Sequence, residues 1–359
     1  MTYHVIGLMS GSSLDGLDIV FVELKENNNN WQFTLQASAC IEYDNEWCNK
    51  LKQASHLTAY DYNLLHTAYG HFIGKQVNGF IETNQLKGKV DLITSHGHTV
   101  FHSPLNHTTT QLGDGAAIAA ITEINVVSDL RAIDVALGGQ GAPIVPVGEK
   151  LLFNEYDYLL NIGGIANISI NREDYVAFDI CPANRILNML ANNNGQPYDA
   201  GGLIAAKGII NNNLLSQLNN LDYYKQAYPK SLANSFGTDI IYPLIQSFNL
   251  PVENALRTYV EHIAIQIKDV FIKINPSKGK LFITGGGALN TFLIERISFL
   301  LTPLQIETII PSKEIINYKE AIIMSLLGVL RIRNEYTVLS TVTGASRNSI
   351  GGALWFGRR

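Results

Sequence analysis

The first 43 residues carry apolar runs separated by one small, polar loop. Residues 5–9 and 17–24 are apolar enough for buried strands, and 31–43 is a third extended stretch. Residues 10–16 between the first two runs are glycine-rich, so they predict a hairpin loop that does not open a helix. A dinucleotide fingerprint and a Walker loop both need strand, loop and helix in succession. A phosphate-facing hairpin loop and an ordinary turn remain the two interpretations.

The same order of elements returns in the second half of the chain. Residues 158–162 form an apolar run, 163–167 a small-residue loop, 168–170 a strand and 175–180 a third strand. A repeat more than a hundred residues away is too long for a solenoid unit. The pattern therefore predicts an α/β protein of two similar domains that face each other across a cleft.

The remaining periodicity predicts helices and strands between these two hairpins and after them. Helices are expected at 47–83, 116–120, 184–190, 203–210, 252–274 and 318–330, and strands at 90–94, 124–129 and 281–284.

Composition restricts the class of protein. The 359 residues are 46% hydrophobic and 16% charged, with a formal charge of −5 and no basic block, which disfavours nucleic acid and anionic membranes as partners. Three cysteines without a CxxC pair argue against a disulfide framework and fit a reducing compartment. With no apolar run of membrane-spanning length, we expect a soluble cytoplasmic protein.

A histidine group follows the strand at 90–94. His96, His98 and His102 invite a metal site, but no carboxylate or cysteine nearby completes a ligand set. A polar substrate loop and a plain cluster at a strand end are the other interpretations, and we favour the loop.

Four further positions carry candidate chemistry. Arg131 and Asp134 precede a glycine-rich stretch and form either a solvated corner or a cation and a hydroxyl acceptor for a ligand. Asp179 ends a buried strand, as a general base or as a carboxylate at a helix N-terminus. Gly285, Gly286 and Gly287 follow a strand, where a nucleotide can approach the backbone closely. Glu320 is a ligand-binding acid or an acid in a first helical turn.

Several motifs resemble one known family when they are taken in order. Residues 7–18, Gly-Leu-Met-Ser-Gly-Ser-Ser-Leu-Asp-Gly-Leu-Asp, resemble the opening motif of the anhydro-N-acetylmuramic acid kinases, of the sugar kinase/hsp70/actin superfamily, with Ser12 in place of the family's Thr. Residues 95–99 resemble its Ser-His-Gly-Gln-Thr loop, with His98 in place of Gln. Residues 128–143 and the tail at 343–357 match as well.

The loop after residue 178 departs from the family pattern. The family has Asp-Thr-Gly-Pro-Gly-Asn, and here Ile180, Cys181 and Ala183 replace Thr and both glycines, whereas Asp179 and Asn184 remain. The Thr hydroxyl is lost, and Ala183 lacks the tolerance of glycine for positive φ. Substrate specificity is therefore open.

The resemblance implies a fold and a set of sites. The fold is two duplicated ribonuclease-H-like domains of the actin/hexokinase type around a central cleft, residues 1–135 with 345–359 packed back on them, and residues 136–344. It implies Asp179 as the catalytic base. ATP would be bound by Gly11, Ser12, Ser13, Leu14, Asp15, Gly16, Leu17, Asp18, Gly285, Gly286 and Gly287, and the sugar by His96, His98, Arg131, Asp134 and Glu320.

The implied reaction uses ATP and Mg²⁺. Water opens the 1,6-anhydro ring of 1,6-anhydro-N-acetylmuramic acid and O6 is phosphorylated, which gives N-acetylmuramate 6-phosphate in peptidoglycan recycling and amino-sugar catabolism. Asp15 and Asp18 are candidates for holding Mg²⁺ through water, and a homodimer is expected. An ordinary hexose or amino-sugar kinase and a non-catalytic nucleotide-binding relative are the alternatives.

Overall fold

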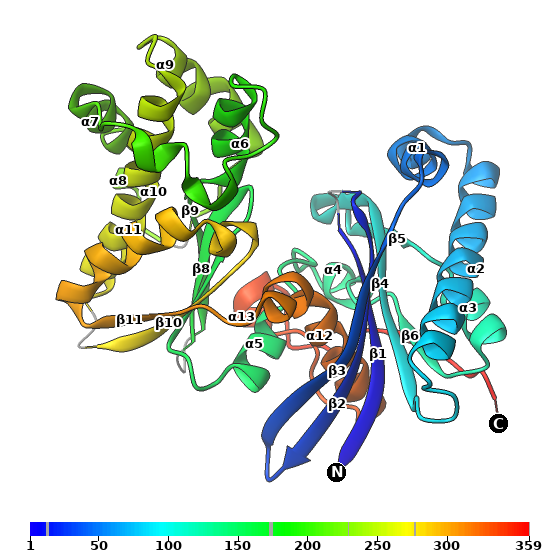
Figure 1. Cartoon of the computed structure of the whole chain (residues 1–359). Coiled ribbons are helices and arrows are strands. Elements are labelled where there is room, and N and C mark those ends of the chain that lie inside the picture. The colour runs from blue at the N-terminus through cyan, green and yellow to red at the C-terminus, as the bar shows by residue number, and fades with distance from the viewer. Residues whose placement is uncertain (12–13, 172–174, 229, 276–277, 359) are drawn as a thin grey trace. The chain divides into compact units, whose positions relative to one another are not determined.

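The computed structural model describes residues 1–11, 14–171, 175–228, 230–275 and 278–358. They divide into two compact units, Met1–Asn154 with Tyr318–Arg359, and Glu155–Asn317. Figure 1 labels most of the elements of both units. The strands are β1 (Thr2–Ser10), β2 (Gly16–Asn27), β3 (Asn30–Glu42), β4 (Leu92–Ser103), β5 (Thr108–Leu112), β6 (Val126–Ser128), β7 (Tyr158–Ile162), β8 (Ile165–Ile170), β9 (Val176–Pro182), β10 (Gly279–Thr284), β11 (Ile306–Ile309) and β12 (Ala353–Trp355). The helices are α1 (Asn45–Gln53), α2 (Ala59–Thr83), α3 (Gly115–Thr122), α4 (Ala132–Ala136), α5 (Pro146–Leu152), α6 (Asn184–Asn192), α7 (Asn212–Asn219), α8 (Asp222–Lys225), α9 (Tyr242–Gln246), α10 (Val252–Ile274), α11 (Thr291–Leu301), α12 (Lys313–Ile332) and α13 (Ser340–Thr343).

The two sheets have the same strand order. The first sheet runs β12-β6-β4-β1-β2-β3, with β5 paired to β4, and the second runs β11-β10-β7-β8-β9. In each, the first three strands of the unit are antiparallel, and two later strands, β4 and β6 in the first unit and β10 and β11 in the second, run parallel to the first. This third-second-first-fourth-fifth order is that of a ribonuclease-H-like sheet. The predicted duplicated α/β fold is confirmed, and so are both glycine-loop hairpins.

The first sheet is covered on both faces, which explains its continuous apolar first strand. Ile6 and Leu8 point into a core that they share with side chains of α2. Gly7, on the opposite face, lies so close to α12 that a Cβ there would stand 2.1 Å from the carbonyl oxygen of Ala321. Glycine at this position therefore lets α12 pack directly on β1.

The first unit extends beyond the predicted residues 1–135 and 345–359. Pro146 begins α5, and α5 packs on α12 within the first unit. Lys319 donates to Glu149 at 2.7 Å in a buried ion pair between these helices. A Cβ on Gly148 would lie 2.4 Å from Ile323. These contacts hold α5 and the part of α12 from Tyr318 onward together in the first unit.

Three local predictions are wrong. The expected substrate loop at 95–102 continues β4, because β5 pairs with it from His98 to Ser103. The helix expected at 203–210 is replaced by short 3₁₀ turns, and the chain becomes extended at Gly208, where its backbone packs so closely on α10 that a Cβ would lie 2.0 Å from the carbonyl oxygen of Glu253. The helix expected at 47–83 is divided into α1 and α2, with Thr58 as a new N-cap.

Candidate active site

The loop of the first hairpin lies at the carboxyl end of β1. Ser10 pairs with Leu17, so residues 11–15 form the loop, in which Ser12 and Ser13 are outside the described residues. Leu14 has a φ of 59°. The side chain of Leu17 is buried in the core of the unit, so only the backbone of this residue is available to a ligand at the loop. Gly16 is required by β3, because a Cβ there would lie 2.7 Å from Sγ of Cys40.

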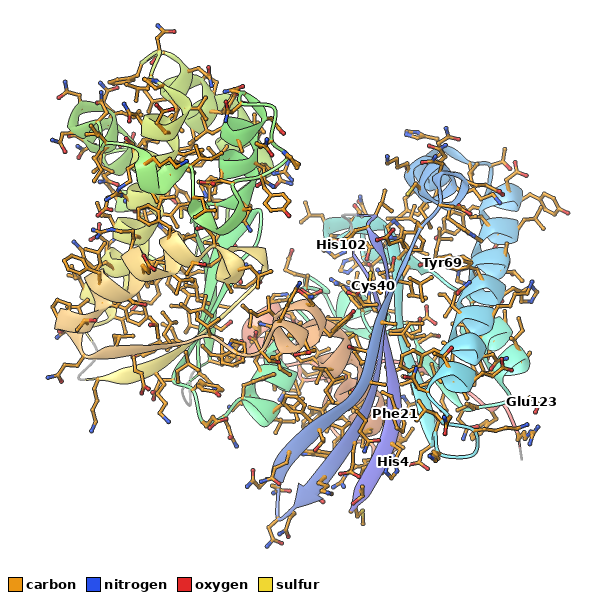
Figure 2. All side chains as sticks on the ribbon, in the orientation of Figure 1. His4, Phe21, Cys40, Tyr69, His102 and Glu123 are labelled. Atoms are coloured by element: carbon orange, nitrogen blue, oxygen red, sulfur yellow. The ribbon has the colours of Figure 1, made fainter. Side chains whose placement is uncertain are left out.

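Acidic side chains gather beside this loop. Asp18 pairs across the sheet with Cys40, whose thiol donates to its carboxylate. Burial raises the pKa of Asp18 to about 6, the hydrogen bond from the thiol opposes the rise, and the negative charges of Asp15 and Glu320 add to it. Glu320 lies well inside α12, so the first-turn interpretation is wrong. Figure 2 shows Cys40 and His102 toward one end of the first sheet and His4 toward the other.

His96 and Arg131 form one hydrogen-bonded pair. Nε of Arg131 donates to Nε2 of His96 at 2.9 Å, and the other imidazole nitrogen faces the carbonyl oxygen of Gly97 at 2.8 Å. Burial and, to a lesser extent, the positive charge of Arg131 lower the pKa of His96 to about 3, so this imidazole is neutral. Arg131 also donates to the carbonyl oxygen of Gly141 at 2.8 Å, and the charge of Glu320 acts on its guanidinium.

Asp134 holds the glycine-rich stretch that follows it. Its side chain is fully buried, and its two carboxylate oxygens accept from the N–H of Gly141 and the hydroxyl of Thr343, each at 2.7 Å. Gly141 is the residue whose carbonyl accepts from Arg131. Asp134 therefore positions Arg131 through this loop, a role that no signal in the local sequence indicated.

The three histidines of β4 have separate partners. Nδ1 of His98 lies 3.2 Å from Oγ of Ser10, and Nδ1 of His102 lies 3.2 Å from the hydroxyl of Thr109. In the part of the chain that the structure describes, no group of three or more potential ligands could hold a metal ion.

In the second unit, Asp179 is fixed at the edge strand β9. One carboxylate oxygen accepts from the N–H of Leu232 at 2.8 Å, its own N–H donates to the carbonyl oxygen of Lys230, and Tyr223 donates to its carbonyl oxygen. The register between β8 and β9 shifts by one residue at Ile180, a bulge of the kind that redirects a side chain. Burial raises the pKa of Asp179 above its ordinary value, and the hydrogen bond from Leu232 opposes the rise.

The structure also decides two alternatives around Asp179. The N-cap of α6 is Ala183, so Asp179 does not cap this helix. Ala183 has a φ of −130°, hence the alanine carries no left-handed strain where the family has glycine. Burial raises the pKa of the Cys181 thiol, which makes it a poor nucleophile.

Of the three glycines after β10, Gly286 lines a cavity of about 280 Å³ in the second unit. Gly285 has a φ of 79°, and a Cβ there would lie 2.6 Å from Oδ1 of Asn161, so glycine is required. The expected helix does not follow directly: a 3₁₀ turn (Gly286–Leu289) comes first, and α11 begins at Thr291 with Asn290 as its N-cap. Side chains that the sequence did not single out complete the wall: Leu187, Asn188, Tyr198, Leu289 and Asn290.

Two ribonuclease-H-like units with a glycine loop in each first hairpin define the sugar kinase/hsp70/actin class of proteins. Within this class, residues 3–357 match the family described as anhydro-N-acetylmuramic acid kinase. The chain is 34% identical to the anhydro-N-acetylmuramic acid kinase of Aliivibrio fischeri and 32% identical to that of Sulfurovum sp., each over 98% of both chains. It belongs to this family.

Among solved structures, the activator of the 2-hydroxyisocaproyl-CoA dehydratase from Clostridium difficile with bound ADPNP is 13% identical to this chain. The match covers 92% of this chain and 96% of that one, with a TM-score of 0.44. None of the described helices is long and apolar enough to cross a membrane.

Proposed function

We propose that this protein opens the 1,6-anhydro ring of 1,6-anhydro-N-acetylmuramic acid with water and phosphorylates O6 from ATP. The products are N-acetylmuramate 6-phosphate and ADP, in peptidoglycan recycling. Membership of the family supports this activity. The observation that carries the chemistry is Asp179, a carboxylate with one oxygen held by a backbone N–H and a pKa raised by burial.

Asp179 acts as the general base. It takes a proton from water, the water oxygen attacks the anomeric carbon, and the bond from that carbon to O6 breaks. The electron pair left on O6 then attacks the γ-phosphate, and ADP leaves. A carboxylate with a raised pKa suits this task, because a base is most effective when its pKa approaches the working pH.

Residues of the first unit bind the phosphates and the sugar. The backbone of residues 11–18 faces the phosphates, and Arg131, held by His96 and Gly141, binds an anionic group of a substrate. The carboxylates of Asp15 and Asp18 fit Mg²⁺ held through water, because a nearby cation would offset the negative charges of Asp15 and Glu320, which add to the effect of burial on the pKa of Asp18. Such an ion neutralises charge on the β- and γ-phosphate oxygens.

The adenosine of ATP is assigned to the cavity beside Gly286. Its leucine side chains and Tyr198 offer apolar surface, and its asparagine amides offer donors and acceptors. Such a mixture of apolar walls and a few polar groups is typical of small-molecule sites.

The test separates this reaction from that of an ordinary sugar kinase. ADP release is measured over a panel of anhydro and reducing amino sugars, and the reaction on the anhydro sugar is then run in ¹⁸O-water and stopped early. We expect turnover on the anhydro sugar, with label on the anomeric carbon and none in the new phosphate. Turnover only on reducing sugars, or an unlabelled anomeric oxygen, would establish the ordinary kinase instead.

A further inference from the structure

Three hydrogen bonds join Asp179, Tyr223 and Lys230 in a closed ring. The N–H of Asp179 donates to the carbonyl oxygen of Lys230 at 2.9 Å, and the hydroxyl of Tyr223 donates to the carbonyl oxygen of Asp179 at 2.7 Å. Nζ of Lys230 donates to the carbonyl oxygen of Tyr223 at 2.9 Å. The ammonium of Lys230 therefore closes a ring that includes the backbone of the proposed base.

The segment that begins at Lys230 also holds the carboxylate of Asp179. Residues 230–233 are irregular, and the N–H of Leu232 donates to Oδ2 of Asp179 at 2.8 Å. Because an irregular segment is not fixed by the regular hydrogen bonds of a helix or a sheet, its side-chain contacts decide where it lies. Lys230 is two residues before Leu232, so a fixed Lys230 side chain restricts the position of this N–H.

The ammonium of Lys230 has two contacts with one buried residue. It lies 2.9 Å from the carbonyl oxygen of Tyr223 and 4.1 Å from the centroid of the same residue's ring, which is a cation–π contact. Tyr223 belongs to α8, and its side chain is buried. Burial and, to a lesser extent, the charge of Lys273 lower the pKa of Lys230 to about 8, so the ammonium still predominates at neutral pH.

We propose that Lys230 is a positioning residue: its ammonium anchors residues 230–232, and this segment orients the carboxylate of Asp179 for proton transfer from water. The role of the carboxylate rests on the proposed function, whereas the anchoring of the segment does not. A general base works only within hydrogen-bond reach of the proton that it takes, and a misplacement of about 1 Å can cost about 10²-fold in rate.

A second lysine on the same short helix supplies a matched control. Lys273, on α10, donates to the carbonyl oxygen of Tyr224 at 2.8 Å and is outside the ring of hydrogen bonds around Asp179. Methionine at either position removes an ammonium and keeps an unbranched side chain. Lys230→Arg keeps a cation that can donate to the carbonyl oxygen of Tyr223 and stack on its ring. These variants separate the anchor from the loss of a charge beside α8.

The first experiment measures the anchor without turnover. Amide hydrogen exchange of the full chain, read by mass spectrometry in peptides that contain Leu232, reports on the N–H that bonds to Asp179. Lys230→Met should speed this exchange about tenfold or more, the effect of losing a hydrogen bond to a charged acceptor. Lys230→Arg and Lys273→Met should exchange like the wild type, and so should peptides from the middle of α10 in every variant.

Two outcomes of this experiment would overturn the inference and leave the proposed function standing. One is unchanged exchange at Leu232 in Lys230→Met. The other is an acceleration that extends to α10 or is equally large in Lys273→Met, because it would show that the lysine stabilises the unit as a whole.

The second experiment tests whether Lys230 acts through Asp179. In Lys230→Met, kcat on the anhydro sugar should fall about tenfold, because the base is present but less often in position. KM for ATP should be unchanged, Lys230→Arg should recover most of the rate, and Lys273→Met should match the wild type. In the Asp179→Asn background, Lys230→Met should cost no further rate.

An additive loss in the double variant, or a wild-type kcat in Lys230→Met, would contradict the positioning role. A loss in Lys230→Arg as large as that in Lys230→Met would contradict it as well. No turnover of the anhydro sugar by the wild type would instead refute the proposed function, and the exchange experiment would still decide the anchor.

Discussion

Replacing Asp179 with asparagine removes the proposed base and preserves its position. The asparagine Oδ1 can accept from the N–H of Leu232 as the carboxylate oxygen does at 2.8 Å, and the shape is unchanged. An amide cannot take a proton from water at neutral pH. We therefore expect kcat on the anhydro sugar to fall by about 10²–10⁴-fold, the usual contribution of a general base.

Unlike kcat, the free energy of unfolding of this variant should not decrease. Burial raises the pKa of Asp179, so the folded protein disfavours the ionised carboxylate. That cost appears as the pH rises through the range between the pKa of the unfolded chain and the higher pKa of the folded chain. Asp179→Asn removes it, so at neutral pH the free energy of unfolding should equal or slightly exceed that of the wild type.

The same reasoning predicts the pH profile. In the wild type, kcat/KM should fall on the acid side with an apparent pKa above the ordinary 3.8, because the base must be ionised. Initial rates from pH 4 to pH 8, run with coupled ADP detection, would test this at about half-unit steps.

A matched control makes the same chemical change elsewhere in the second unit. Asp222 is 94% exposed and pairs with Lys225 at 2.8 Å, so Asp222→Asn should leave kcat unchanged. If Asp179→Asn retained kcat within tenfold of the wild type while folding normally, the assignment of the base would be refuted. A variant that melted well below the wild type would refute the reasoning about burial.

Three further predictions concern the loops and the helix packing. Gly11→Val should weaken ATP binding in calorimetry with the fold intact, because a branched side chain blocks close approach of phosphate to the loop; unchanged affinity would exclude this loop as the phosphate site. Gly287→Ala should cost about 1–3 kcal/mol in urea unfolding, since its Cβ would lie 2.2 Å from an isoleucine side chain of β7, whereas Gly286→Ala should leave the free energy of unfolding nearly unchanged, since the nearest atom there is 3.4 Å away; equal losses of stability in the two variants would contradict this. Lys319→Met should lower the free energy of unfolding by about 3–5 kcal/mol, because it removes the ammonium from the buried carboxylate of Glu149. A double variant with Glu149→Leu should recover part of that loss. A loss below about 1 kcal/mol in the single variant would contradict this account.

Local pattern predicted the hairpins well, because each needed only neighbouring residues. An apolar strand, a glycine-rich loop and a second apolar strand specify a hairpin without distant contacts. The helix at 252–274 was predicted with the bounds of α10, since its apolar period is unbroken over its whole length. Repetition of the hairpin then supplied the duplicated fold.

The errors arose where distant contacts decide the structure. Residues 95–102 are polar and resemble a loop, but pairing with β5 extends the strand through them. A helix at 203–210 cannot continue through Gly208, because the backbone there packs on α10 and the N–H of Ile209 donates to Asn254. The pair of Glu149 with Lys319 joins residues 170 positions apart, and no spacing rule connects them.

The two repeats use equivalent positions in their sheets for different side chains. Counted from the turn of each first hairpin, Asp18 on β2 corresponds to Asn167 on β8, because each lies in the second pair from the turn. Their partners on the third strand are Cys40 and Asp179. Each repeat therefore holds one carboxylate at this level of the sheet, on the second strand in the first unit and on the third strand in the second.

Both carboxylates have a pKa raised by burial, but their surroundings suit different tasks. Asp18 has the negative charges of Asp15 and Glu320 nearby, a condition that a cation relieves and that hinders a lone base. The causes that act on Asp179 are burial and one backbone hydrogen bond, without a neighbouring charge. The divergence of this duplicated cross-strand pair thus accounts for a carboxylate suited to a bound cation in the first unit and a carboxylate suited to proton transfer in the second.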